Sequence, residues 1–109
     1  MNYRLVFKRR AQTEIAEAFA WYEQDSIAMG SAFLAELDRV ERFIRLNPQL
    51  YPEVETDIRR ANLRRFPYSL FYVVDGAQIS VLSCLHQRRE PDEQPATPGS
   101  SNRKPEPGQ

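Results

Sequence analysis

The spacing of apolar residues changes from a strand pattern to a helical pattern near the start of the chain. Residues 2–8, NYRLVFK, place tyrosine, leucine and phenylalanine at alternate positions, which predicts a strand with one buried face. From about residue 11 the apolar positions Ile15, Phe19 and Tyr22 are spaced three or four apart. Such spacing places them on one face of an amphipathic helix.

A second run of helical spacing follows a break that we expect at Gly30, which has Ser26 and Ser31 around it. The run has apolar residues at Phe33, Leu37, Val40 and Ile44. It should end near Asn47, because the proline that follows disfavours helical geometry in the residue before it. The pattern therefore predicts two helices joined by a short polar segment, an αα-hairpin with one apolar stripe on each helix.

The second half of the chain returns to strand patterns. A weaker strand is expected around residues 58–63, and two stronger ones, residues 68–74 and 79–85, flank Asp75-Gly76. Asp-Gly between two apolar runs is a strong signal for a hairpin. The order predicts an α+β protein: an N-terminal strand, an α-helical hairpin, then antiparallel strands forming one small sheet with the hairpin on one face.

Length and composition predict one folded domain followed by a tail. A chain of 109 residues has room for a single domain. Residues 91–109 contain five of the eight prolines and no large apolar residue, so we expect a disordered segment that cannot offset its ordering entropy by burial. The expected boundaries are 1–90 for the domain and 91–109 for the Pro-rich tail.

Several functional classes are disfavoured by what the chain lacks. It has no apolar run long enough to cross a bilayer and no secretory signal at its start, so we expect a cytoplasmic protein with no membrane partner. Its single cysteine, Cys84, excludes an internal disulfide and is expected to be a small core residue. One cysteine with one histidine is too few ligands for a structural zinc site, and we expect no metal or cofactor.

The zero net charge hides a strong asymmetry along the chain. Residues 11–56 contain nine acids and three arginines, whereas residues 57–89 contain six arginines and two acids. Those arginines are Arg59, Arg60, Arg64, Arg65, Arg88 and Arg89. Successive side chains of a strand point to opposite faces, so we expect one member of each pair to face the open side of the sheet. Such a patch suits a polyanion such as nucleic acid, and the alternative is a solvated face that pairs with acids of a partner.

The only histidine, His86, ends the last predicted strand and is followed by Arg88. Neighbouring guanidinium groups disfavour the imidazolium form, which suits acid–base chemistry near neutrality. The alternative is a histidine at a strand end that bonds the backbone. For Trp21, beside the first apolar stripe, we expect the edge of the core, and the alternative is a docking surface for a partner helix.

These segments together resemble the RelE/ParE superfamily of toxins from bacterial type II toxin–antitoxin (plasmid stabilisation) modules. The resemblance covers residues 3–90 and includes YRLVFKRRAQTEIAEAFAWYE at the start, the pair Tyr51-Pro52, LRRFPYSLFYVV and VLSCLHQRREP. It implies a helical hairpin packed on a small antiparallel sheet. It also implies a toxin that inhibits growth and is neutralised by a cognate antitoxin whose extended or helical tail wraps it.

The superfamily holds two activities, and the resemblance favours one of them. RelE-like members are ribosome-dependent endonucleases that cut mRNA, and the strand matching residues 68–74 typically begins with a critical arginine. Here that position is Ser69. ParE-like members inhibit DNA gyrase and stabilise its cleaved-DNA state, and the His86-Gln87-Arg88 arrangement is similar to theirs. Cleavage by attack of a 2′-hydroxyl needs a positive group to stabilise the phosphorane, so the missing arginine counts against a nuclease.

We therefore expect a non-enzymatic, ParE-like toxin that binds DNA gyrase, and we leave a homo-oligomer open. The residues expected on the target-binding surface are Arg59, Arg60, Arg64, Arg65, His86 and Arg88. One alternative is a ribosome-dependent mRNA endonuclease in which His86 acts as acid or base and Arg65 or Arg88 holds the phosphate. Another is an inactive relative that only binds an antitoxin.

Overall fold

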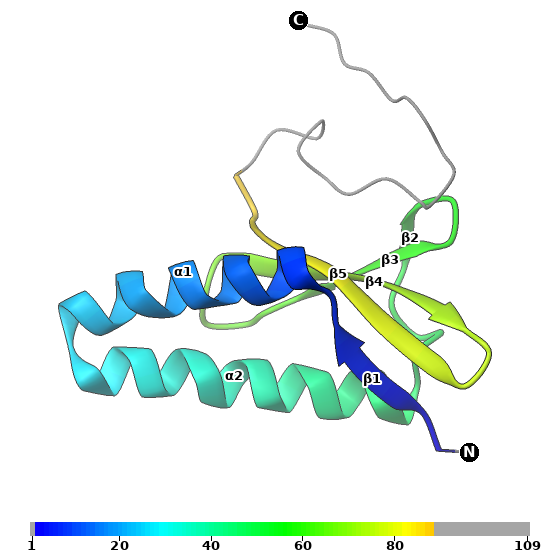
Figure 1. Ribbon diagram of the computed structural model, residues 1–109, viewed down its shortest axis with the longest axis horizontal. Coiled ribbons are helices and arrows are strands. Elements are labelled where there is room, and N and C mark those ends of the chain that lie inside the picture. Colours follow the sequence, from blue (N-terminus) through cyan, green and yellow to red (C-terminus); the bar gives the residue numbers. More distant parts are fainter. Residues whose placement is uncertain (1, 89–109) are drawn as a thin grey trace, which may run out of the picture.

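The computed structural model describes residues 2–88 and confirms the predicted α+β class. Arg89 and the Pro-rich tail predicted at 91–109 lie outside the described residues, so the tail stays a prediction. The elements follow in the order β1 (Arg4–Phe7), α1 (Arg9–Asp25), α2 (Ile27–Leu46), β2 (Glu53–Glu55), β3 (Ile58–Asn62), β4 (Tyr68–Asp75) and β5 (Gln78–His86), as Figure 1 shows.

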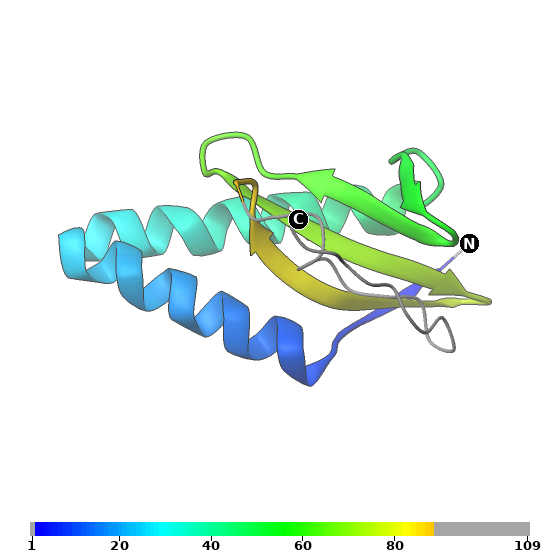
Figure 2. The ribbon, with the colours of Figure 1, turned by 90° about the horizontal axis from the view of Figure 1, so that it is seen from above.

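All five strands form one sheet in the order β1-β5-β4-β3-β2. The pairs β2/β3, β3/β4 and β4/β5 are antiparallel, as predicted, whereas β1 runs parallel to β5 at one edge. Parallel neighbours need a long crossover connection, and in this chain α1 and α2 lie between β1 and the other strands along the sequence. The two helices run side by side in opposite directions, and their hairpin lies to one side of the sheet (Figures 1 and 2). The three-residue strand β2 was not predicted.

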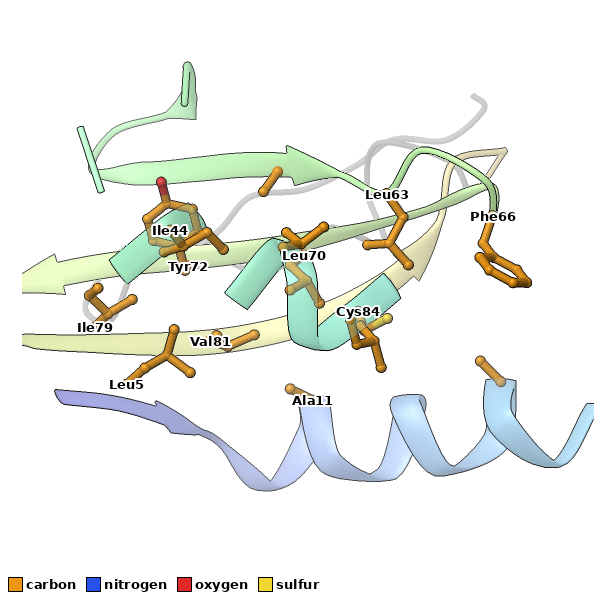
Figure 3. Close-up of a cluster of buried hydrophobic side chains, with 14 of the residues drawn as sticks. Leu5, Ala11, Ile44, Leu63, Phe66, Leu70, Tyr72, Ile79, Val81 and Cys84 are labelled. Carbon is orange, nitrogen blue, oxygen red and sulfur yellow. The ribbon is translucent and has the colours of Figure 1, made fainter. Parts of the chain in front are cut away.

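The apolar stripe predicted for the second helix is the centre of the core. All four of its predicted positions are buried, and they pack in one cluster with residues of β1, β3, β4 and β5. Figure 3 shows Ile44 of α2 in the same cluster as Tyr72 of β4, with Leu70 farther along that strand. The Tyr72 hydroxyl donates to the Pro48 carbonyl oxygen at 2.6 Å, and burial raises the pKa of this phenol. That bond gives the buried hydroxyl a partner and ties the end of α2 to the sheet.

The first helix contributes small residues as well as its predicted stripe. Ile15, Phe19 and Tyr22 are only partly buried against the core, whereas Ala11 and Ala18 are buried completely or nearly so. Alanine lets the helix backbone come close to a neighbouring element, and α1 packs along both α2 and β5. The stripe was predicted correctly, and the alanines that allow the close approach were not.

The break between the helices lies at Ser26, so the prediction of a break at Gly30 is wrong. Ser26 is extended and its hydroxyl accepts a hydrogen bond from the Met29 backbone N–H at 3.0 Å, which caps the start of α2. Gly30 is buried within that helix. A Cβ atom there would lie 3.0 Å from Cε1 of Phe19 and 3.2 Å from Cβ of Glu23. Glycine is present because the two helices approach closely at this point, not because the chain turns.

The predicted hairpin between β4 and β5 is confirmed. Asp75 pairs with Gln78, so the turn has two central residues, and the first, Gly76, has a φ of +63°. Residues with a side chain rarely adopt this left-handed backbone, which is why glycine suits the turn.

Candidate binding surface on the open face of the sheet

Strand register places several polar residues together on the sheet face opposite the helices. Arg60 of β3 lies opposite Phe71 of β4, and Asn62 lies opposite Ser69. Ser69 in turn lies opposite Leu85 of β5. Directly opposed residues share a face. Together with His86 and Gln87 these residues line a pocket of about 210 Å³, which we call the open-face pocket.

Hydrogen bonds fix the walls of the open-face pocket. The Ser69 hydroxyl donates to Oδ1 of Asn62 at 2.6 Å, and Ser69 is buried. The Gln87 backbone N–H donates to the Pro67 carbonyl at 2.8 Å, and its side-chain amide donates to the Tyr68 carbonyl at 3.1 Å. The end of β5 is therefore tied to the start of β4.

An apolar cluster lies beneath these polar groups. Ile58, Phe71 and Leu85 are buried on this face and pack with three partly buried residues, Val54, Val73 and Leu82. The open face therefore has a small apolar cluster of its own. Its polar residues gather at the open-face pocket, whereas the charge pattern predicted a basic patch.

The first arginine pair is divided between the two sides of the sheet. Arg60 is half-buried and lines the open-face pocket, and among residues 2–88 no carboxylate forms an ion pair with it. Arg59 faces the other way, where its guanidinium donates to the Tyr51 carbonyl at 2.6 Å and the Gln49 carbonyl at 3.1 Å. It also lies 3.5 Å from a carboxylate oxygen of Glu53. Arg59 therefore supports the connection between α2 and β2 and does not lie with the other predicted surface arginines.

The second arginine pair lies in a loop, so its expected place on a strand is wrong. Arg64 and Arg65 follow the end of β3 and precede β4, and both are exposed. The Arg64 backbone N–H donates to Oε2 of Glu36 at 2.6 Å. The Arg65 guanidinium lies 6.0 Å from the centre of the Phe66 ring. Side chains in such a loop reach outward from the end of the sheet instead of following its pleat.

A buried carboxylate anchors this loop. Glu36 of α2 is 7% exposed and accepts two hydrogen bonds from the Arg39 guanidinium, at 2.9 and 2.8 Å. These bonds hold the pKa of Glu36 below its ordinary value, although burial opposes the shift. The same carboxylate raises the pKa of Arg39. Because Glu36 also accepts the Arg64 N–H, its carboxylate joins α2 to the loop of residues 63–67, which we call the basic loop.

His86 takes the position of a strand-end histidine that bonds the backbone. Its Nδ1 accepts a hydrogen bond from the Arg88 N–H at 3.1 Å, and its ring lies 5.1 Å from that of Tyr68, edge to face. An accepting Nδ1 leaves the proton of a neutral imidazole on Nε2. Within residues 2–88 no hydrogen bond or ion pair joins the ring to a carboxylate. Arg88, held by this bond, is exposed at the end of β5.

The described residues contain a single thiol, that of Cys84, which lies in the core. No group of three or more metal-ligating side chains is found among residues 2–88. The thiol of Cys84 is buried as predicted, and burial raises its pKa to about 12. A thiol with so high a pKa is a poor nucleophile. Neither described helix is both long and apolar enough to span a bilayer.

The sequence predicted Arg60 and His86 as site residues but none of the other five residues of the pocket. These are Asn62, Ser69, Phe71, Leu85 and Gln87. Arg60 and Asn62 are two residues apart on a predicted strand, which signals a shared face. Register across three strands decides which residues meet there, and the hydrophobic pattern of a single strand does not give that register.

A second surface lies between the two helices and the first strand. An apolar groove of about 560 Å³, the helix groove, is lined mainly by Phe7, Ile15, Ala16, Phe19, Leu34 and Leu37. Leu34 is 44% exposed there. Trp21, at the other end of α1, is 68% exposed, so the expectation that it lies at the edge of the core is wrong. Its alternative, a docking surface, stays a prediction.

Comparison with known proteins identifies the family. Residues 5–91 match the family model described as "ParE toxin of type II toxin-antitoxin system, parDE". The chain belongs to the ParE toxin family. This match confirms the resemblance to the RelE/ParE superfamily and identifies the chain as ParE-like. A toxin of a type II system has an antitoxin as its partner.

A solved structure agrees with the ParE fold. It is titled "Chromosomal ParDE TA system from P. aeruginosa", with a TM-score of 0.65 and 19% identity, over 75% of this chain and 92% of that one. At this identity the likeness shows the fold alone. No curated protein matches the chain.

Proposed function

We propose that this ParE-family toxin arrests growth by binding DNA gyrase and holding it in its cleaved-DNA state, without cutting nucleic acid itself. Ser69 is the observation that carries the proposal. It occupies the strand position where nuclease relatives have an arginine, and it is buried and donates its hydroxyl to Asn62. The first position after the start of β4 therefore supplies no guanidinium to stabilise a phosphorane.

The proposed target-binding surface is the basic end of the sheet. It comprises Arg60, Arg64, Arg65 and Arg88, with His86 holding the backbone of Arg88. The hydrogen bond from Gln87 to Pro67 brings the loop with Arg64 and Arg65 next to the end of β5. Clustered arginines suit the phosphates of DNA held by gyrase and acidic patches of the enzyme. Arg59 was expected on this surface, and its bonds to backbone carbonyls make it a support of the fold instead.

Charge reversal tests this surface. We expect the double variant Arg64→Glu, Arg65→Glu to lose growth inhibition on induced expression, because it replaces two positive charges of the proposed surface with negative ones. Both residues are exposed, so the variant should still fold. The matched control is Lys8→Glu, Arg9→Glu, which reverses two exposed charges at the start of α1. Acids are favourable at a helix N-terminus, so the control should fold and remain toxic. If the folded Arg64→Glu, Arg65→Glu variant were fully toxic, the proposed target-binding surface would be wrong.

A nuclease is the second candidate, and the open-face pocket is what favours it. This pocket brings Arg60 and His86 to one end of the sheet. In that account His86 acts as acid or base, and Arg65 or Arg88 holds the phosphate. Mapping of mRNA ends after induction separates the two candidates. Ribosome-dependent cuts that disappear in His86→Ala would establish the nuclease, whereas toxicity without cuts supports gyrase.

We propose that the antitoxin docks on the helix groove and the neighbouring strand edge. The groove is lined mainly by apolar residues of α1 and α2. Among residues 2–88 the strand β1 pairs only with β5 and forms one edge of the sheet, so its other side is available for an added strand. An amphipathic helix followed by an extended segment would cover both features. An inactive relative would keep this surface and lack growth inhibition altogether.

A further inference from the structure

The open-face pocket has the composition of a site for a small anion. Its lining combines the cation Arg60 with the amides of Asn62 and Gln87, and contains no carboxylate. The volume of about 210 Å³ is below the roughly 300 Å³ at which sites for whole small molecules begin. The occupant that fits is therefore a single charged group and not a complete cofactor.

The donors of the pocket are available and held on strands. Among residues 2–88 no carboxylate pairs with the Arg60 guanidinium, which carries five N–H donors. Oδ1 of Asn62 already accepts the Ser69 hydroxyl, so the donating nitrogen of the same amide is left for an occupant. Both residues lie on β3, next to β4, and donors on strands are positioned more precisely than donors on loops.

We propose that the open-face pocket binds a phosphate group, with the Arg60 guanidinium and the Asn62 amide nitrogen as donors above an apolar floor of Phe71 and Leu85. The guanidinium fork takes two oxygens of such an anion. A phosphate has further oxygens, so the amide can bind an oxygen that the guanidinium does not take. This inference goes beyond gyrase inhibition, because the pocket would bind phosphate whatever the target of the toxin is.

The test is a titration of the full-length chain with inorganic phosphate, followed by amide chemical shifts at constant ionic strength. We expect saturable shifts at the residues that line the pocket. The variant Arg60→Gln should bind phosphate at least about tenfold more weakly, the loss expected for charge-assisted hydrogen bonds. The matched control Arg64→Gln removes the same charge from the exposed loop and should change the affinity less than about threefold.

A second variant keeps the test independent of Arg60. Asn62→Asp replaces the donating amide with a carboxylate on the same strand and should also weaken phosphate binding about tenfold or more. Melting curves of each variant confirm that it is folded. Shifts that do not saturate, or equal losses in Arg60→Gln and Arg64→Gln, would overturn the proposal by showing only diffuse attraction.

Competition identifies the source of the phosphate. A short oligonucleotide without terminal phosphates that displaces inorganic phosphate would identify a nucleic-acid phosphodiester. Displacement by a nucleoside monophosphate alone would identify a free phosphomonoester. Either result supports the pocket. Because binding is measured without gyrase, its failure would not be confused with failure of the proposed function.

Discussion

At the scale of single residues, the most consequential side chain is one that the charge pattern concealed. Glu36 is one of nine acids in residues 11–56. Its spacing from Phe33 and Val40 places it on the apolar face of the helix, but the sequence does not show which groups it binds there. In the structure it is buried and joins Arg39 to the backbone of the basic loop. The sequence located the arginines but could not show what holds them, because Glu36 and Arg64 meet only after folding.

Replacing this carboxylate should destabilise the protein in a pH-dependent way. We expect Glu36→Gln to lower the free energy of unfolding by about 2 kcal/mol at neutral pH, because it weakens charged hydrogen bonds of a buried group. The pKa of Glu36 is lowered in the folded state. Its contribution is therefore present above the unfolded pKa and disappears as the pH falls through the folded one.

Urea unfolding of variant and wild type at neutral and acidic pH measures this effect. The gap between the two proteins should begin to close near the ordinary glutamate pKa of about 4.3 and disappear only below the lower folded pKa of Glu36. Asp38→Asn is the control, because that exposed carboxylate pairs with the exposed Arg42 on the surface of the same helix and should matter by less than about 1 kcal/mol. A gap between wild type and Glu36→Gln that persists in acid would contradict the role given to Glu36.

At the scale of elements, the hydrophobic pattern predicted both helices, β1 and the β4–β5 hairpin. Their apolar periods are long and their ends carry clear signals, such as Pro48 after the second helix. Two elements were not predicted correctly. The strand β2 has three residues, which is too short for an alternating pattern to show. The joint between the helices was predicted at Gly30 because glycine often ends a helix. Glycine also allows two helices to approach closely, and a single sequence does not distinguish these two roles.

Gly30→Ala tests the contact between the helices. Alanine is a better helix former by about 1 kcal/mol, so a glycine that only interrupted a helix would gain stability on replacement. Here the new Cβ would meet Phe19 and the Cβ of Glu23 at 3.0 and 3.2 Å. Overpacking typically costs about 1–3 kcal/mol, so we expect a lower melting temperature. Ser31→Ala, at the exposed next position, is the control, and a stabilised Gly30→Ala protein would contradict the close approach.

At the scale of the whole molecule, the structure separates two surfaces that the linear sequence mixes. The basic end of the sheet is proposed for the target, and the helix groove for the antitoxin. The general division into scaffold and functional stretch could be predicted from charge and apolar spacing. The pocket could not, because its walls come from three strands whose register the pattern does not fix.

This separation predicts a toxin that escapes its antitoxin. We expect Leu34→Arg to remain toxic while co-expressed antitoxin no longer restores growth, because the charge enters the helix groove. Leu50→Arg is the control, since Leu50 is 68% exposed and lies in the connection between α2 and β2. Rescue of both variants by the antitoxin would place its docking site elsewhere.

A gyrase assay tests the central claim most directly. Purified chain is added to DNA supercoiling reactions, and the products are examined for cleaved DNA trapped with the enzyme. The account predicts inhibition of supercoiling with trapped cleavage, and loss of both in the Arg64→Glu, Arg65→Glu variant. Normal supercoiling by gyrase in the presence of folded wild-type chain would contradict it.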